Sequence, residues 1–236
     1  MATLSIYNDG EYFDNNPSWH QEDSSWKANE IAKILGRNKI IPQSVVEVGC
    51  GAGVILIELS KMNQFVGTKF NGYDPSEGAI ALTVPLANAQ VAFKCADYFA
   101  TPLKKRPDLI LAIDVVEHVP DYWGFLSNCR SHAEYKIYHI PLDVHLSSVL
   151  RGTLTDGRKS VGHLHYFTQE TALSTLADTG HTIIDYHLTS GALDLASKRR
   201  SMRLNLSNIP RRLLAVISKR WAARVLGGFS LMVLTQ

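Results

Sequence analysis

The stretch VVEVGCGAGVIL, residues 45–56, places three glycines, Gly49, Gly51 and Gly53, between two apolar runs. The first run has the composition of a buried strand, and the second resembles the start of a helix. Glycines at such a junction permit a tight turn and let a ligand come close to the backbone. The stretch therefore predicts a strand, a ligand-binding turn and a helix.

Strand-like and helix-like segments alternate on both sides of this turn. Apolar runs predict strands at residues 44–48, 69–74, 90–95, 107–114, 134–140 and 181–188, and the closing run GFSLMVLTQ predicts a last strand. Helical patterns separate most of these runs. Such an order is typical of an α/β protein whose parallel sheet is covered by helices on both faces.

Composition limits the class of protein. The chain has 236 residues, of which 45% are hydrophobic and 19% charged, so we expect one globular domain. Cys50, Cys95 and Cys129 form no CxxC pair and are expected to be reduced. The N-terminus is polar and acidic rather than a signal peptide, and no apolar run is long enough to be a transmembrane segment. We therefore expect a cytoplasmic protein.

Four carboxylates stand at or near the carboxyl ends of the first four predicted strands: Glu47, Asp74, Asp97 and Asp114. In parallel sheets of this kind, ligands bind at the carboxyl ends of the strands. Acids at strand ends are costly to bury without partners, so packing alone does not explain all four. We expect them to surround the glycine turn.

The spacing of the glycines narrows the choice of ligand. A dinucleotide-binding turn has the pattern G-x-G-x-x-G, whereas Val54 occupies the position of its third glycine here. Asp74 ends the second predicted strand, where a carboxylate can accept hydrogen bonds from both ribose hydroxyls. Asp97 is placed to meet an adenine amino group beside the aromatic ring of Tyr98. A nucleoside-containing cofactor fits this set, and a nicotinamide enzyme is disfavoured.

The segments VEVGCGAG, GYDPS, CADYF, DLILAIDVVEHVPD and HLHYFTQETALSTLADTG together resemble the class I S-adenosylmethionine-dependent methyltransferases, roughly over residues 45–185. The resemblance implies a seven-stranded, mostly parallel, doubly wound sheet with an antiparallel last strand. It also implies S-adenosylmethionine as the cofactor. The positions that it assigns to the cofactor are Lys27, Glu47, Gly49, Cys50, Gly51, Gly53, Asp74, Pro75, Asp97, Tyr98, Asp114 and Val115.

Each of these positions has an expected partner on the cofactor. By resemblance, residues 49–53 cradle the methionine part and Asp74 holds the ribose. Asp97 reads the adenine N6 and Tyr98 flanks the ring. The backbone at Asp114 and Val115 lies near the methionine ammonium. Lys27 is a candidate for the methionine carboxylate, and His20 a candidate for the mouth of the site, although both could equally be surface side chains.

We expect one methyltransferase domain over residues 1–236. Residues 1–40 form an N-terminal lid and helix, 41–190 the cofactor-binding core, 191–226 a basic helical insertion and 227–236 the last strand. From residue 195 onward there are nine Lys or Arg residues and no Asp or Glu. These charges could meet an anionic acceptor or form a solvated face.

Inside the insertion, residues 210–226 predict a helix, with Pro210 in its first turn and Gly227 just past its end. The residues expected to pack on the protein body are Leu213, Leu214, Ile217, Trp221 and Val225. The cations expected to point outward are Arg211, Arg212, Lys219 and Arg220. Binding to a membrane surface would use the same charges, but the apolar side looks needed for packing.

Three histidines are candidate general bases, because imidazole titrates near neutral pH: His163, His165 and His145. The alternative is that GHLHYF is a structural turn leading to a helix capped by Thr168. Alignment of the acceptor with the electrophilic methyl group supplies most of the rate, so a base is optional.

Asp114, Glu117 and His118 have the i, i+3, i+4 spacing that can place them on one side of a helical turn. The motif is similar to the E-x-x-E-H metal site of ubiquinone-pathway O-methyltransferases and small-RNA 2′-O-methyltransferases, with Asp in place of the first Glu. His163 or His165 is placed to complete such a site. The expected ion is Mg²⁺ or Mn²⁺. The alternative is a chain without metal.

The sequence predicts an enzyme that moves a methyl group from S-adenosylmethionine to a small-molecule or glycan-like acceptor, most simply on oxygen. One alternative is an RNA 2′-O-methyltransferase, which the scarcity of aromatic residues among the basic ones disfavours. Another is a non-catalytic cofactor-binding subunit, which the intact acidic positions disfavour. The sequence carries no signal for oligomeric state.

Overall fold

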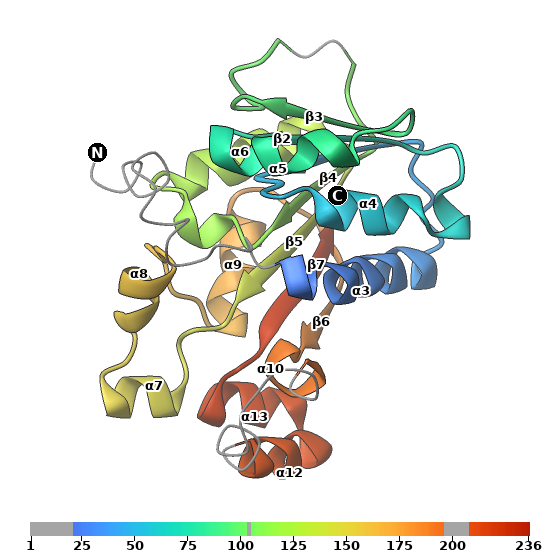
Figure 1. The fold of residues 1–236 in the computed structure, drawn as a ribbon. Coiled ribbons are helices and arrows are strands. Elements are labelled where there is room, and N and C mark those ends of the chain that lie inside the picture. The colour runs from blue at the N-terminus through green and yellow to red at the C-terminus, as the bar shows by residue number, and fades with distance from the viewer. Residues whose placement is uncertain (1–20, 103–104, 196–207) are drawn as a thin grey trace.

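The computed structural model describes residues 21–102, 105–195 and 208–236, and its core is one seven-stranded sheet in the order β3-β2-β1-β4-β5-β7-β6 (Figure 1). The strands are β1 (Ser44–Val48), β2 (Lys69–Asp74), β3 (Val91–Cys95), β4 (Leu109–Ile113), β5 (Tyr135–Pro141), β6 (Ile183–Thr189) and β7 (Ser230–Thr235). β7 lies between β5 and β6 and runs antiparallel to both, while the other pairs are parallel. The predicted fold class is confirmed.

The α-helices within the described ranges are α3 (Ser24–Arg37), α4 (Val54–Ser60), α5 (Glu77–Thr83), α6 (Tyr122–His132), α7 (Leu146–Arg151), α8 (Asp156–Ser160), α9 (Gln169–Asp178), α10 (Gly191–Asp194), α12 (Ile209–Ile217) and α13 (Lys219–Leu226). The short 3-10 helices are η1 (Gln21–Asp23), η2 (Asn63–Phe65), η3 (Val84–Leu86) and η4 (Val116–His118). The first half of the predicted lid, with His20, lies outside the described residues, as does the 196–207 part of the insertion.

Helices cover both faces of the sheet because alternate residues of each strand point to opposite sides. Val45 packs with the apolar side chains of α3 and α4, and its neighbour Val46 packs with those of α6 and α9. All five residues of β4 are buried, as expected of a central strand covered on both faces. Thr168 caps α9 as predicted, accepting a hydrogen bond from the Thr171 amide.

The insertion differs from the prediction of one continuous helix. Ser218 has extended backbone and its side chain caps the Trp221 amide, so the chain forms α12 and α13 instead. Pro210 and Gly227 do stand at the predicted ends.

The predicted packing of the insertion was largely wrong. Leu213, Ile217 and Trp221 are mostly exposed, while Ala222 and Ala223 are buried against the protein body. The break at Ser218 changes which residues face inward. The expectation for Arg211 was also wrong, because its guanidinium bonds the Asn208 side chain and the Leu226 carbonyl.

No helix among the described residues is both long enough and apolar enough to cross a membrane.

Candidate active site

A cavity of about 1370 Å³ lies at the carboxyl ends of β1, β2 and β4. The glycine turn, the β2 and β4 ends, the start of α3 and the loop after β5 line it. A second cavity of about 800 Å³ lies at the opposite ends of β4 and β5, beside Arg106, Arg130 and Lys136. Because parallel sheets bind ligands at the carboxyl ends of their strands, the larger cavity is the candidate site.

The glycine turn is held open by the backbone of β2. The amides of Gly49 and Cys50 donate to the Tyr73 carbonyl over 2.8 and 3.1 Å. Gly53 has a φ of +72°, and a Cβ there would lie 2.3 Å from the Phe93 ring. Only glycine fits that position without strain, which explains why the turn must break the apolar pattern of the strand.

Asp74 ties the turn to the end of β2. One carboxylate oxygen accepts the Gly51 amide and the other accepts the Ser76 amide, each over 2.9 Å. Burial raises the pKa of this carboxyl, and the two amide hydrogen bonds oppose that rise. The carboxylate lines the cavity, where its remaining lone pairs can accept hydroxyl groups of a ligand.

Asp114 is fixed by two neighbouring side chains, Lys27 and His139. It has a φ of +54°, which residues other than glycine seldom adopt. Lys27 Nζ lies 2.8 Å from Oδ2, and His139 Nδ1 lies 2.5 Å from Oδ1. Burial raises the pKa of Asp114, but His139 and Lys27 outweigh it and hold the pKa well below its usual range. The carboxylate is therefore ionised and held in one position.

Glu47 lies beneath the cavity floor and is 1% exposed. Its Oε2 has no hydrogen-bond partner among the described residues. Burial raises the pKa of the Glu47 carboxyl to about 8, although the Lys27 charge lowers it. Without a ligand, this side chain is mostly protonated at neutral pH.

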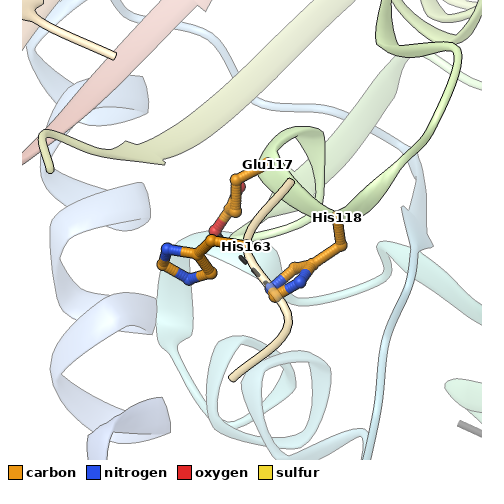
Figure 2. Close-up of side chains that lie close together, drawn as sticks. All are labelled: Glu117, His118 and His163. Carbon is orange, nitrogen blue, oxygen red and sulfur yellow. Dashed lines mark ion pairs between the residues drawn. The ribbon is translucent and has the colours of Figure 1, made fainter. Parts of the chain in front are cut away.

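Glu117, His118 and His163 converge at the side of the cavity (Figure 2). Each offers one ligand-type atom, and these atoms all lie within 4.8 Å of one another. Glu117 is fully buried, and neither of its oxygens has a hydrogen-bond partner within the described ranges. Burial and the Asp114 charge raise the pKa of Glu117 well above its ordinary value.

Each of the two imidazole rings of this cluster contacts an oxygen atom outside the cluster, which fixes its orientation. His118 Nδ1 lies 3.2 Å from the Gly162 carbonyl oxygen, and His163 Nδ1 lies 2.6 Å from Asp143 Oδ2. Burial and the nearby His163 lower the pKa of His118 to about 4, so its ring is neutral at pH 7. The carboxylate and carbonyl contacts fix both rings in the manner typical of metal-binding histidines.

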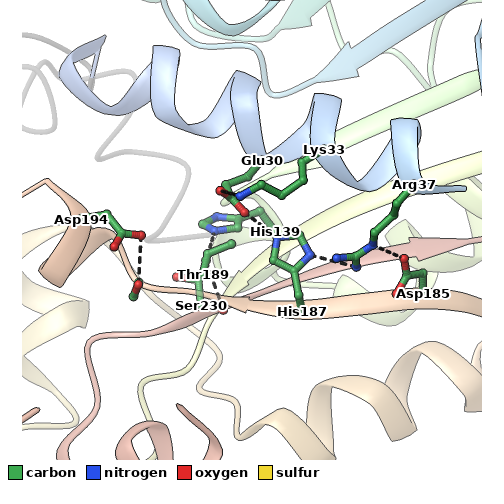
Figure 3. A network of polar contacts seen from close by, with 10 residues as sticks. Glu30, Lys33, Arg37, His139, Asp185, His187, Thr189, Asp194 and Ser230 are labelled. Atoms are coloured by element: carbon green, nitrogen blue, oxygen red, sulfur yellow. Dashed lines mark hydrogen bonds and ion pairs between the residues drawn. The ribbon is translucent and has the colours of Figure 1, made fainter. Parts of the chain in front are cut away.

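A polar network holds α3 over the site (Figure 3). Glu30 Oε2 lies 2.6 Å from His187 Nε2 on β6, and Glu30 Oε1 lies 2.7 Å from Lys33 Nζ. Arg37, at the end of the helix, pairs with Asp185 of β6. These contacts fix the helix that carries Lys27 to the cavity.

The structure brings together most of the predicted cofactor positions. The predicted residues that line the cavity are Lys27, Glu47, Gly49, Cys50, Gly51, Gly53, Asp74, Pro75, Asp114 and Val115. Asp97 is exposed and lies outside the cavity lining. Tyr98 is also outside it, because its ring is buried against Tyr73 and Phe99 rather than open to a ligand.

Of the three candidate general bases, two line the cavity and one does not. His163 and His145 line the cavity, although His145 also caps α7 through the Ser148 amide. His165 does not line it, since its ring packs on Tyr122 and its Nε2 lies 2.9 Å from the Val119 carbonyl oxygen. Of the predicted metal ligands, Asp114 is not in the group of three, and its oxygens contact Lys27 and His139 instead.

Some site residues were missed by the sequence reasoning. Trp26 lines the cavity with its ring 6.2 Å from that of His139, and Phe229 enters from the loop before β7. Asp143 supports His163 from the loop after β5. Of these three, only Trp26 could have been found from the sequence, because it directly precedes the candidate Lys27. Asp143 and Phe229 reach the site through contacts between distant segments, which sequence spacing does not predict.

A family model described as a methyltransferase domain matches residues 18–201. A ubiquinone biosynthesis O-methyltransferase of Bradyrhizobium diazoefficiens is 34% identical over 90 residues, which are 37% of this chain and 34% of that protein. Its counterpart in Nitrobacter winogradskyi is 33% identical over 90 residues, 37% of this chain and 33% of that protein. The matches thus span about a third of these relatives.

Solved methyltransferases share the architecture. Magnesium protoporphyrin IX methyltransferase of Synechocystis, with bound S-adenosylhomocysteine, superposes with a TM-score of 0.57 at 18% identity, covering 94% of this chain and 85% of that chain. The N-methyltransferase NodS of Bradyrhizobium japonicum gives a TM-score of 0.55 at 13% identity, covering 94% and 97%. At these identities the likeness concerns the fold alone.

Proposed function

The chain belongs to the methyltransferase family whose model covers residues 18–201, and on that premise we propose that it transfers a methyl group from S-adenosylmethionine to an oxygen of a small-molecule acceptor. The observation that carries the proposal is the joint position of the glycine turn, Asp74 and Asp114 around one large cavity. The names of the ubiquinone-pathway relatives favour an oxygen acceptor.

The cavity offers a partner for each polar part of the cofactor. Asp74 accepts the ribose hydroxyls, while the glycine turn leaves room for the backbone of the methionine part. Asp114 and Lys27 form an ion pair at 2.8 Å, which suits a zwitterionic amino acid. Asp114 faces the ammonium group of the cofactor, and Lys27 faces its carboxylate group. When the cofactor binds, each side chain therefore exchanges its ion-pair partner in the protein for a group of the cofactor.

His163 is the group we assign to the acceptor hydroxyl. Its Nδ1 lies 2.6 Å from the Asp143 carboxylate, which holds the ring in place and leaves Nε2 free to face the acceptor. Nε2 can then take the hydroxyl proton as the oxygen attacks the methyl carbon. The bond between that carbon and the sulfonium sulfur breaks at the same time, and S-adenosylhomocysteine leaves. Alignment of the acceptor by the cavity walls supplies the larger share of the rate enhancement, because the sulfonium methyl group is already electrophilic.

Glu117, His118 and His163 also fit a divalent cation. A buried carboxylate without hydrogen-bond partners, next to two oriented imidazoles, is a donor set suited to Mg²⁺ or Mn²⁺. Such an ion would lower the pKa of an acceptor hydroxyl bound to it. In that case His163 holds the ion, and the chain's own task is to position the hydroxyl.

The first experiment is calorimetry with S-adenosylhomocysteine, followed by methyl transfer to phenols, catechols, sugar nucleotides and short RNA. We expect cofactor binding and transfer to a small hydroxylated acceptor. Absence of cofactor binding would refute the proposal. Binding without transfer to any acceptor would favour the non-catalytic alternative, and transfer to RNA alone would favour the nucleic-acid alternative.

Removing metal ions with a chelator distinguishes the two proposed roles of His163, which are general base and metal ligand. If the cluster holds an ion, EDTA abolishes transfer, Mn²⁺ restores it, and Glu117→Gln removes the response to Mn²⁺. Full turnover in excess EDTA would leave His163 as the base and return Glu117 to a packing role.

A further inference from the structure

Large apolar side chains are exposed on two helices of the chain, α7 and α12. On α7 the exposed fractions are Leu146 52%, Val149 55% and Leu150 77%, and on α12 they are Ile209 49%, Leu213 65%, Val216 88% and Ile217 82%. Single exposed apolar residues are ordinary, but a helix that exposes four of them is not. Among the helices that the structure describes, α12 therefore exposes the most large apolar side chains, followed by α7.

The exposed residues of α12 share one side of the helix. Ile209, Leu213 and Val216 are separated by four and three positions, the spacing of neighbours on a helix surface. On the other side, Leu214 and Ala215 pack against the core. Because α12 is already anchored by that inner side, its outer apolar stripe does not serve packing within the part of the chain that the structure describes.

α7 lies beside the same insertion, at one end of the molecule (Figure 1). The charge of Arg211 on α12 acts on His145, the cap of α7, and a Cβ at Gly227 would lie 2.2 Å from the His145 ring. We call the exposed apolar side chains of both helices, with Trp221, the α7/α12 surface. His145 also lines the active-site cavity, so this surface adjoins its rim.

Cations accompany the apolar side chains. Arg212 and Lys219 are exposed on the insertion, and Arg151 is exposed at the end of α7. Arg220 and Arg224 pair with Glu170, so the insertion also neutralises an acid of the adjoining helix. Residues 195–236 contain no Asp or Glu. An apolar stripe with basic flanks is complementary to a negatively charged lipid surface.

We propose that the α7/α12 surface docks the protein on an anionic lipid bilayer, with the apolar side chains inserted at the boundary between headgroups and acyl chains. Val216 and Ile217 project almost fully from the molecule, which suits insertion among mobile lipids, whereas a protein partner would have to supply a matching groove. Arg212 and Lys219 then lie at the level of the phosphates. The rim of the cavity at His145 lies next to the bilayer.

Sedimentation of the full chain with vesicles tests this directly. The protein should bind vesicles of phosphatidylcholine that contain about 30% of the anionic lipid phosphatidylglycerol. It should bind vesicles of pure phosphatidylcholine much more weakly. Val216→Ser with Ile217→Ser should weaken binding at least about tenfold, since apolar burial is lost. Arg212→Gln with Lys219→Gln should weaken binding to the anionic vesicles about thirtyfold and reduce its salt dependence.

Val66→Ser is the matched control, because Val66 is 81% exposed but lies after η2, away from this surface. It should bind vesicles as the unmodified chain does. Equal binding to neutral and anionic vesicles, or no effect of either double variant, would overturn the proposal. So would a dimer in analytical ultracentrifugation that the apolar variant dissociates in the absence of lipid, because the surface would then belong to a second copy of the chain.

Discussion

Replacing Glu47 with Gln should stabilise the ligand-free protein at alkaline pH and leave it almost unchanged at acidic pH. Glu47 is buried at 1% exposure, and burial raises the pKa of its carboxyl to about 8 from an ordinary value of 4.5. Below pH 4.5 the folded and unfolded chains both carry the proton. Between pH 4.5 and 8 the unfolded chain releases it while the folded chain retains it, so the free energy of unfolding falls as pH rises.

The size of the effect follows from the same two values. The difference between 4.5 and about 8 corresponds to roughly 5 kcal/mol if it is fully expressed. Water in the adjoining cavity reduces this, so we expect a gain of about 2 to 5 kcal/mol for Glu47→Gln at pH 8.5. The gain should shrink toward zero at pH 4.5, because Gln carries no proton to release.

Urea unfolding of both proteins at half-unit steps between pH 4.5 and 8.5 measures this difference. Glu58→Gln, on the partly exposed side of α4 where Glu58 pairs with Lys61, is the matched control and should show no comparable rise above pH 5. A stability difference for Glu47→Gln that stays constant across this range would refute the reasoning, because it would mean that Glu47 is ionised in the folded chain.

Two further substitutions test the glycine turn and its anchor. Asp74→Ala should weaken S-adenosylhomocysteine binding in calorimetry by about 1.5 to 3 kcal/mol, since charge-assisted hydrogen bonds to the ribose and to the Gly51 amide are lost; unchanged affinity would remove the ribose assignment. Gly53→Ala should destabilise the fold by about 2 to 4 kcal/mol in urea, because a Cβ meets the Phe93 ring at a φ of +72°. Gly36→Ala in α3, where the nearest atom to a Cβ lies at 4.0 Å, should instead stabilise it by about 0.5 to 1 kcal/mol, and equal effects at both glycines would contradict this account.

Local patterns in the chain predicted the sheet and the floor of the site. The strand, glycine turn and helix of residues 45–56 follow from residue type alone, because only glycine accepts the backbone of that turn. Asp74 and Asp114 could be placed around it since each lies at the carboxyl end of a strand, and the carboxyl ends of parallel strands share one edge of the sheet. That geometry needs no knowledge of distant contacts.

The tertiary structure decided which of the candidate side chains reach the cavity. Asp97 and Tyr98 follow β3 just as Asp74 ends β2, yet Tyr98 turns into the core, where burying its ring against Tyr73 and Phe99 stabilises the fold. His163 and His165 are two residues apart, but only His163 meets a carboxylate, because Asp143 comes from another segment. Sequence spacing does not distinguish such pairs.

By itself, the sequence determined the class of fold, the edge of the sheet at which the candidate site lies and the basic character of residues 195–236. It did not determine which apolar residues of the insertion are buried. Leu213 and Leu214 are equally hydrophobic, yet Leu214 packs against the core and Leu213 is exposed. The difference depends on which segments lie against α12, and a break at Ser218 is enough to change it. Burial is a property of the assembled chain, whereas strand ends and glycine turns are encoded locally.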